Sequence, residues 1–152
     1  MKNLLLRSVL AGLAAASLFS PLYAGQAESD TVSAFLDAYN EHDSNKMLQF
    51  AASDVRWMSI ADNKITVESE GKKALAAYMD GYFESMPSTR SEPRDIQSVG
   101  NFVSMIEEAQ WQRDDKAQSR CAMAVYEIKE GLIRNVWYFK GQPCEDSSTA
   151  AP

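Results

Sequence analysis

The sequence predicts an α+β fold, a cone-shaped α+β barrel in which three N-terminal helices pack on the concave face of a curved, mostly antiparallel sheet. Two observations predict it. Apolar residues recur at helical spacing in two segments between residues 29 and 86. Four runs of strand character then follow one another, separated by short polar turns. Helices followed by an antiparallel meander are typical of a sheet covered on one face by helices.

The first helix is expected to begin with Ser29 or Asp30 as its N-cap and to end near Asp43. A second, short helix should follow with Ser44 as its cap. The buried positions of these two helices are Val32, Phe35, Leu36, Tyr39, Met47, Leu48 and Phe50. In the first helix, the spacing of Val32, Phe35, Leu36 and Tyr39 predicts a buried apolar stripe.

A strand over residues 54–60 comes next, because its apolar and polar residues alternate. The turn at 61–63 lets residues 65–69 pair back against it. The third helix should start at Gly71 and end at Met86-Pro87, since the residue before a proline disfavours helix. Its apolar side consists of Leu75, Tyr78, Met79, Tyr82 and Phe83.

The rest of the domain is predicted to be a four-stranded meander. Its strands are residues 93–99, 102–112, 117–128 and 132–140, joined by turns at Gly100-Asn101, Asp114-Asp115 and 129–131. Because turn centres fix strand register, they predict which residues lie opposite each other. The expected pairs are Arg94 with Glu107, Ile96 with Met105, Ala122 with Glu107, Ala124 with Trp137, and Tyr126 with Asn135.

All of these pairs fall on one face, which is expected to be the concave, helix-covered side. The same face would carry Val103, Ala109, Trp111 and Phe139. An error of one residue at the Asp114-Asp115 turn would exchange Glu107 for Glu108 on this face.

Residues 1–24 resemble a removable signal peptide. Lys2 and Arg7 precede an apolar run over residues 9–19, and small residues allow cleavage after Ala24 or, alternatively, Ala27. An apolar run of about eleven residues is much shorter than the roughly 20 that span a bilayer, so no membrane anchor is expected after cleavage. The sequence therefore predicts a periplasmic or secreted protein.

The chain beyond the leader is expected to form one domain over residues 29–141, followed by a flexible tail over 142–152. Removal of two basic residues leaves 13 basic and 21 acidic ones, so the mature net charge is 13 minus 21, or -8. An acidic surface repels phosphate backbones, which excludes nucleic acid as an expected partner.

Cys121 and Cys144 are the only cysteines. In an exported chain they could form one disulfide that ties the tail to the sheet. The alternative is a buried free Cys121 with Cys144 loose in the tail, because sequence alone does not give their separation.

The motifs Phe35-Leu-Asp-Ala-Tyr39, Asp54-Val-Arg-Trp57 and Glu70-Gly-Lys-Lys-Ala-Leu75, in this order and spacing, resemble the nuclear transport factor 2-like superfamily, which includes SnoaL-like cyclases and ketosteroid isomerases. The resemblance covers residues 29–141 and implies a cone-shaped pocket. Many relatives dimerise through the outer sheet face, so a homodimer is expected by analogy, with Cys121, Met123 and Val125 on that face. The fold hosts many chemistries and does not name the reaction.

The ketosteroid isomerase mechanism needs a helix-one tyrosine, a strand carboxylate and a protonated aspartate. The resemblance places these roles at Phe35, at or beside Ser59, and near Ala124, none of which supplies the required group. Tyr39, one turn further along the first helix, could offer a displaced donor. Steroid isomerisation by that mechanism is therefore disfavoured.

Glu107 is the candidate for a different acid-base site, because a carboxylate in an apolar cavity has a raised pKa. Two alternatives compete with this interpretation: a structural ion pair of Glu107 with Arg94, which would keep the pKa low, and exposure of Glu107 through a register error. His42, the only histidine, is expected at the end of the first helix. No residues have the spacing of a metal site, and no cofactor is expected.

The expected pocket residues are Tyr39, Trp57, Ser59, Tyr78, Tyr82, Arg94, Met105, Glu107, Tyr126, Asn135 and Trp137. Three hypotheses about function follow. The first is a binding domain for a small apolar or aromatic molecule without assigned catalysis. The second is a SnoaL-like or isomerase-type enzyme that uses Glu107, and the third is a homodimeric interaction module whose pocket is filled by its own side chains.

Overall fold

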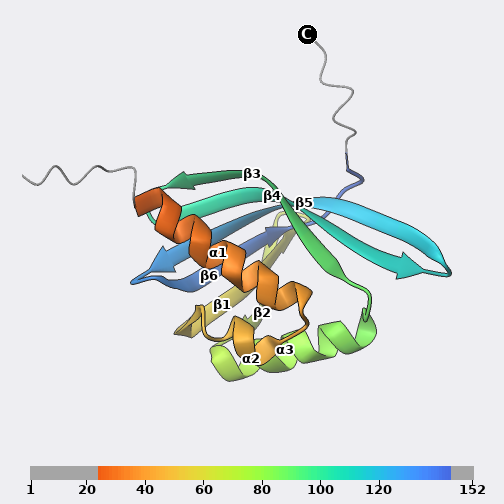
Figure 1. Cartoon of the computed structure of the whole chain (residues 1–152), viewed down its shortest axis with the longest axis horizontal. Helices are drawn as coiled ribbons and strands as arrows, with labels where there is room; N and C mark the ends of the chain where they lie inside the picture. Colours follow the sequence, from red (N-terminus) through yellow and green to blue (C-terminus); the bar gives the residue numbers. More distant parts are fainter. Residues whose placement is uncertain (1–23, 145–152) are drawn as a thin grey trace, which may run out of the picture.

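The computed structural model describes residues 24–144 as three helices and one six-stranded sheet (Figure 1). The elements are α1 (Ala24–Asn40), α2 (Ser44–Met47), β1 (Ala51–Ala61), β2 (Lys64–Glu70), α3 (Lys72–Ser85), β3 (Arg90–Val99), β4 (Phe102–Arg113), β5 (Lys116–Lys129) and β6 (Leu132–Phe139). The expected signal peptide, apart from Ala24, and residues 145–152 lie outside the described residues.

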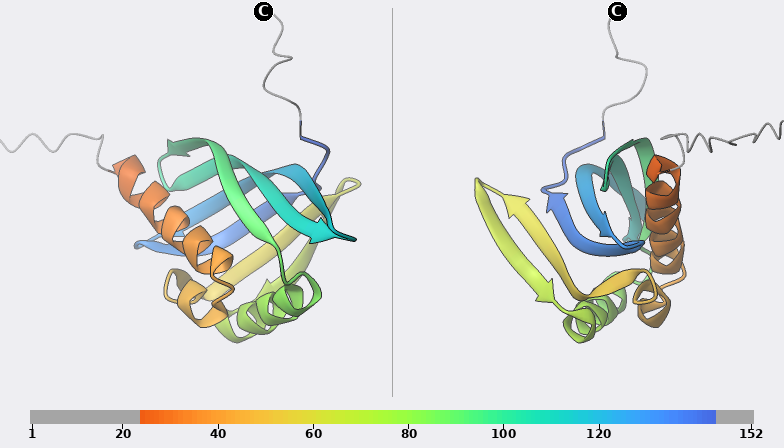
Figure 2. Two further views of the ribbon diagram at one scale, coloured as in Figure 1. Left: turned by 45° about the vertical axis from the view of Figure 1, so that its right-hand side comes forward. Right: turned by 90° about the vertical axis from the view of Figure 1, so that its left-hand side faces the viewer.

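The sheet has the strand order β2-β1-β6-β5-β4-β3, and every neighbouring pair is antiparallel except β1 and β6. It bends strongly, so that β1 and β2 stand away from the curl formed by β3 to β5 (Figure 2). Helix α1 packs against β3 and β4, and α3 packs against β1 and β2. This arrangement confirms the predicted α+β class and the helix-covered concave face.

Two helix starts differ from the prediction. Helix α1 already includes Ser29, whose hydroxyl donates to the Gly25 carbonyl at 3.0 Å instead of capping a helix start. The N-cap of α2 is Asp43, whose side chain accepts from the Lys46 amide at 2.8 Å. A serine hydroxyl can accept a hydrogen bond from an amide of the following turn as an N-cap, or donate one to the carbonyl four residues earlier within a helix. The local sequence does not determine which of the two bonds forms.

The hairpin turns lie where the sequence predicts them. Positive φ angles occur at Asp62 and Asn63, at Asp114 and Asp115, and at Glu130 and Gly131, which is the left-handed geometry of tight hairpin turns. Asparagine, aspartate and glycine tolerate this region better than other residues. Pairing of Arg113 with Lys116 continues regularly into β4 and β5, so the expected pair of Glu107 with Ala122 is confirmed.

A bulge at Arg134 corrects the predicted β5–β6 register. The pairs next to the turn follow the prediction, with Ile128 opposite Ile133, but Arg134 then has no partner and Tyr126 lies opposite Val136. The predictions that Ala124 faces Trp137 and that Tyr126 faces Asn135 are therefore wrong.

This shift of one residue exchanges the faces of β6. Trp137 and Asn135 lie on the convex side, and Tyr138, opposite Ala124, enters the concave side. Phe139 moves to the convex side with Trp137.

A second irregularity corrects the β3–β4 register. Val99 pairs with Phe102 as the turn predicts, but the pairing shifts between Arg94 and Gln97, where Asp95 has a φ of 49°. Arg94 therefore lies opposite Ile106 on the convex face, and Ile96 has no regular partner. Pro93, and not Arg94, faces Glu107.

The segment after β6 is attached to the sheet. Cys121 and Gln142 exchange two backbone hydrogen bonds of 2.9 Å, and Cys121 and Cys144 form a disulfide with a Cα–Cα separation of 4.8 Å. The bridged alternative of the cysteine prediction is thus the correct one.

Among residues 24–144, no helix has the length and apolar character needed to cross a membrane.

Candidate functional site

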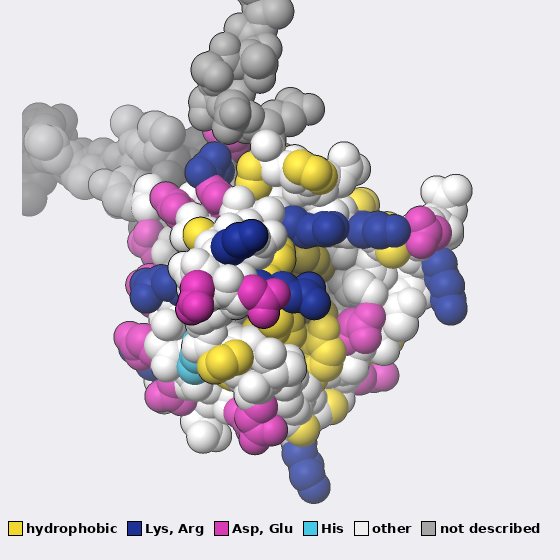
Figure 3. Space-filling view, turned by 90° about the vertical axis from the view of Figure 1, so that its right-hand side faces the viewer, with side chains coloured by type: hydrophobic (Ala, Val, Ile, Leu, Met, Phe, Trp, Pro, Cys, Tyr) yellow, Lys and Arg dark blue, Asp and Glu magenta, His cyan; other side chains and the backbone are white. Residues whose placement is uncertain are grey.

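A cavity of about 100 Å³ lies on the concave face between the sheet and the helices. Its lining comes from α1, α3, β1, β4 and β6 and consists of Tyr39, Trp57, Tyr78, Met79, Tyr82, Glu107, Ala109 and Tyr138. On the side where the C-terminal end of α3 and the β4–β5 hairpin lie, the surface has a hollow in which hydrophobic side chains show between charged ones (Figure 3).

Among the described residues that line the cavity, Glu107 is the only one with an acidic or basic side chain. It is 5% exposed, and the Tyr126 hydroxyl donates to its Oε2 atom at 3.3 Å. It takes part in none of the ion pairs formed within residues 24–144. Burial raises the pKa of the Glu107 carboxyl above its usual range, and the Ser91 and Tyr126 hydroxyls offset part of this rise.

Arg94 does not neutralise Glu107. Its guanidinium pairs with the Glu108 carboxylate on the opposite face of β4. The predicted ion pair of Arg94 with Glu107 is wrong because the irregularity at Asp95 turns Arg94 to the convex side. The carboxylate that faces the cavity is therefore the one without a cationic partner.

Thr89 organises the hydroxyl groups beside the cavity. It is fully buried, and its Oγ1 atom lies 3.2 Å from the Tyr39 hydroxyl and 3.5 Å from the Tyr82 hydroxyl. The ring of His42 stacks on Phe83, and its Nε2 atom lies 2.8 Å from the Thr89 carbonyl oxygen. His42 thus fixes the loop between α3 and β3 at the end of α1, as its expected structural position suggested, and does not line the cavity.

Burial raises the pKa values of Tyr39, Tyr78, Tyr126 and Tyr138 above that of an exposed tyrosine. These side chains consequently keep their protons at neutral pH, and their hydroxyl groups are able to donate hydrogen bonds. A protonated Glu107 would be a further donor, and an ionised Glu107 would be an acceptor. The site combines aromatic walls with several hydroxyl groups and one group that can change its protonation state.

The deep end of the cone is filled. Phe35 packs against Trp57 and Tyr126 with ring centroids 6.3 Å apart in both pairs, and Trp57 stacks on Tyr138 at 6.1 Å. Phe35 is the residue that the resemblance aligns with the isomerase tyrosine. Its ring is 1% exposed and does not line the cavity.

The structure brings five of the expected pocket residues to the cavity: Tyr39, Trp57, Tyr78, Tyr82 and Glu107. Met105 and Tyr126 also lie on the concave side of the sheet. They are buried in the core and do not line the cavity. Ser59 lies on β1, where its hydroxyl donates to Glu68. The assignment of Arg94, Asn135 and Trp137 to the pocket is corrected, because both register shifts turn them to the convex face.

Sequence reasoning missed Tyr138, Met79, Ala109 and the organising role of Thr89. One signal for Tyr138 was present: Ile133 and Val136 are both strongly apolar but three residues apart, and in β6 both are buried. In a regular strand such residues face opposite sides, so their pattern is typical of a bulge between them. Thr89 carries no comparable signal, because it lies between α3 and β3.

The described residues contain one cluster with the composition of metal ligands. Glu108, Cys121 and Cys144 have ligand atoms within 4.8 Å of each other. Both sulfur atoms belong to the disulfide, so the cluster offers no thiolate. It lies on the convex side of β4 and is separate from the cavity.

The sequence matches the family model described as SnoaL-like domain over residues 32–136. No curated protein matches it. Similar solved structures include an uncharacterised cystatin-fold protein from Novosphingobium aromaticivorans, with 22% identity and a TM-score of 0.65 over 74% of this chain and 97% of that one.

Two further similar structures are described as putative polyketide cyclases. The SnoaL-like one from Jannaschia sp. CCS1 has 14% identity and a TM-score of 0.66 over 79% of this chain and 88% of that one. The one from Xanthomonas campestris pv. campestris has 20% identity and a TM-score of 0.57 over 77% and 92%. At these identities the likeness concerns the fold.

Proposed function

Because the chain belongs to the SnoaL-like domain family of the nuclear transport factor 2-like superfamily, we propose that it binds a small molecule in the cavity and that Glu107 exchanges protons with it. The observation that carries the proposal is the position of Glu107: buried, at the cavity wall, hydrogen-bonded to Tyr126 and without a cation. These are the conditions under which a carboxylate has a raised pKa and works as an acid-base group near neutral pH.

The cavity sets the size of the ligand. Typical small-molecule pockets have about 300 to 1,000 Å³, and a dry cavity of about 150 Å³ accommodates benzene. A volume of about 100 Å³ therefore suits a molecule of one small ring or less, unless side chains of α3 move. The aromatic walls favour an apolar body, and the hydroxyl groups favour a carbonyl or hydroxyl substituent.

Proton transfer in this site needs no co-reactant. Ionised Glu107 takes a proton from the carbon next to a carbonyl group, and the electron pair of that C–H bond moves to the carbonyl oxygen as an enolate. Tyrosine hydroxyls beside the cavity can donate to this oxygen, since their raised pKa values keep them protonated. Glu107 then returns the proton to the same molecule at another carbon or at the original one.

Binding without catalysis is the second candidate. The observation that favours it is that none of the three positions aligned with the isomerase residues carries the group that the reaction needs. Phe35 and Ala124 are buried apolar residues, and the Ser59 hydroxyl is bonded to Glu68. The small volume of the cavity also agrees with the hypothesis of an interaction module with a filled pocket.

We propose an exported location and a homodimer as the setting of this activity. The disulfide between Cys121 and Cys144 is compatible with a compartment outside the cytoplasm. The convex face carries an apolar band across β2, β1, β6, β5 and β4 that suits a second copy. It consists of Ile65, Val67, Ile60, Trp137, Phe139, Met123, Val125 and Ile106.

Hydrogen-deuterium exchange at carbon tests the proposal without knowledge of the natural ligand. Small cyclic ketones and 1,3-diketones in D₂O, followed by ¹H NMR, should lose their α-protons faster with the protein than with buffer. Glu107→Gln should reduce the acceleration by about 10²-fold or more, the usual contribution of a general base. Glu108→Gln, its neighbour on the other face, should leave the rate unchanged.

The indole signal of Trp57 separates the alternatives, because this ring lines the cavity. A ketone that shifts the Trp57 signal without faster exchange would contradict proton transfer and favour a binding domain. If no compound shifts Trp57 or exchanges faster, the pocket is filled and the proposal fails.

A further inference from the structure

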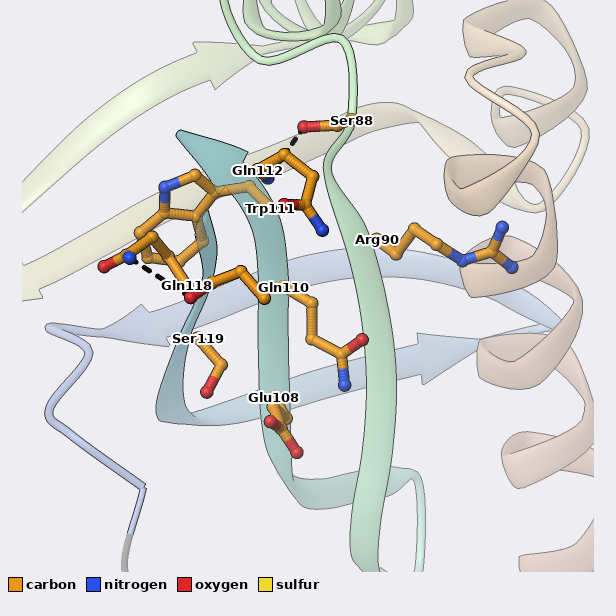
Figure 4. A pocket seen from close by; sticks show the side chains of 9 residues that line it. Ser88, Arg90, Glu108, Gln110, Trp111, Gln112, Gln118 and Ser119 are labelled. Atoms are coloured by element: carbon orange, nitrogen blue, oxygen red, sulfur yellow. Dashed lines mark hydrogen bonds between the residues drawn. The ribbon is translucent and has the colours of Figure 1, made fainter. Parts of the chain in front are cut away.

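A second pocket lies away from the concave cavity, where the segment before β3 passes the end of β4 and the start of β5. It has a volume of about 380 Å³, within the range of about 300 to 1,000 Å³ of small-molecule sites. We call it the hairpin pocket; it is lined by Ser88, Arg90, Glu108, Gln110, Trp111, Gln112, Ala117, Gln118 and Ser119 (Figure 4).

The lining of the hairpin pocket is rich in neutral polar groups. Three glutamine amides and two serine hydroxyls supply both donors and acceptors. Regular β4–β5 pairing sets Trp111 opposite Gln118 and Gln110 opposite Ser119. The indole ring of Trp111 and the amide of Gln118 therefore lie next to each other at one end of the pocket (Figure 4).

The charged groups around the pocket are already paired or point away. Glu108, 8% exposed at its floor, forms an ion pair with Arg94. Gln110 donates to the Glu92 carboxylate at 3.2 Å. The guanidinium of Arg90 extends away from the other lining side chains (Figure 4). Among the described residues that line the pocket, none directs an unpaired cation toward its centre.

We propose that the hairpin pocket is a binding site for a neutral sugar. A half-buried aromatic ring beside several amides and hydroxyls offers an apolar platform together with hydrogen-bond donors and acceptors. A pyranose ring has the complementary chemistry, with C–H groups on its faces and hydroxyl groups around its edge. Trp111 stacks on the ring face, and Gln118, which lies opposite Trp111 on the same face of the hairpin, bonds the hydroxyls.

Local contacts hold this site in place. The backbone N–H of Gln112 donates to the Ser88 hydroxyl at 2.9 Å, and this bond fixes the segment before β3 against β4. The Ser119 hydroxyl lies 3.9 Å from the Cys144 sulfur, so the disulfide supports the other side. Within residues 24–144, the Gln118 side chain bonds to the neighbouring Ala117 carbonyl at 3.1 Å and to no other group.

The three tryptophans make the test specific, because Trp57 lines the cavity, Trp111 the hairpin pocket, and Trp137 the convex face. The ¹⁵N-labelled protein is titrated with glucose, galactose, mannose, N-acetylglucosamine and their disaccharides, and the indole N–H signals are followed. At least one sugar should shift the Trp111 signal saturably at millimolar concentration and leave that of Trp57 unmoved. Trp111→Phe identifies the signal.

Gln118→Ala should weaken binding of that sugar at least tenfold, because Gln118 is exposed and its loss leaves the fold intact. Gln97→Ala removes a glutamine of β3 that is also exposed but lies outside the pocket, and this variant should bind as the wild type does. Glu107→Gln should also bind normally, which keeps this result independent of the proposed proton transfer. Absence of a Trp111 shift with every sugar overturns the proposal, as does equal binding by the Gln118→Ala variant. A shift with adenosine or uridine alone overturns it in favour of a nucleobase site.

Discussion

Glu107 and Glu108 are neighbours on β4, but their carboxylates lie on opposite faces of the sheet and have different partners. Glu107 faces the concave cavity and accepts a hydrogen bond from Tyr126, whereas Glu108 pairs with Arg94 on the convex side. Both are at least nine-tenths buried. Substitution of Glu108 is therefore a matched control for substitution of Glu107. Glu107→Gln removes a carboxylate that has no cationic partner, whereas Glu108→Gln breaks the ion pair with Arg94.

The stability of the protein should depend on pH through Glu107. Its pKa is raised in the folded state, so the folded protein holds a proton at pH values where the unfolded chain has lost it. The stability that the protonated carboxyl gives is complete below the unfolded pKa and is lost as pH rises through the folded pKa. Each unit by which the pKa is raised corresponds to about 1.4 kcal/mol.

Urea unfolding at several pH values between 4 and 9 measures this dependence. The wild type should lose stability relative to Glu107→Gln as pH rises, since glutamine has no proton to lose. Glu108→Gln should be less stable than the wild type near neutral pH, because Arg94 loses its partner. Parallel pH profiles of the wild type and Glu107→Gln would show that Glu107 is not held with a raised pKa.

Loss of the Thr89 hydroxyl should destabilise the fold. Thr89→Val keeps the shape of the side chain but leaves the buried Tyr39 hydroxyl without its partner and removes the longer contact with Tyr82. An unsatisfied buried polar group costs about 1 to 3 kcal/mol. Thr89→Ser, which keeps the hydroxyl, should lose clearly less in the same urea unfolding experiment. Equal losses for valine and serine would assign the effect to the methyl group instead.

The disulfide should contribute to stability mainly through the unfolded chain. Cys121 and Cys144 are 23 residues apart, and closing a loop of that length corresponds to about 3 kcal/mol in the chain-entropy model. The double variant Cys121→Ser/Cys144→Ser should lose that amount in guanidinium unfolding. Addition of a reductant should lower the stability of the wild type to the same level and leave the variant unchanged. A variant as stable as the oxidised wild type would contradict the prediction.

A charge on the convex face should prevent the proposed homodimer. Val67 is 50% exposed and Met123 is 42% exposed on this apolar band, so Val67→Lys and Met123→Lys each place a charge inside the contact. Sedimentation velocity should then report monomers. Thr66→Lys, on the opposite face of the same strand, serves as the control and should remain dimeric. A wild-type protein that sediments as a monomer would contradict the proposed homodimer.

Local chemistry made the meander predictable. Asp62-Asn63, Asp114-Asp115 and Glu130-Gly131 all form turns where the sequence indicates them, because aspartate, asparagine and glycine tolerate the left-handed conformation better than most residues. The pairing of Glu107 with Ala122 follows from the central turn, with no irregularity between them. The helix stripes were equally readable, since burial of one helix face requires apolar residues at fixed spacing.

The sequence by itself determined the α+β class, the order of the elements, the turns and the side of β4 on which Glu107 lies. Only the tertiary structure decided on which face of the sheet Arg94, Asn135, Trp137 and Tyr138 lie. These faces determine which residues line the cavity and leave Glu107 without a cationic partner. The physical reason is that a bulge inserts one residue where a strand must bend around the helices, and side chains alternate with a period of two. One extra residue in β6 therefore reverses every side chain beyond it, and such a bend depends on packing between distant elements.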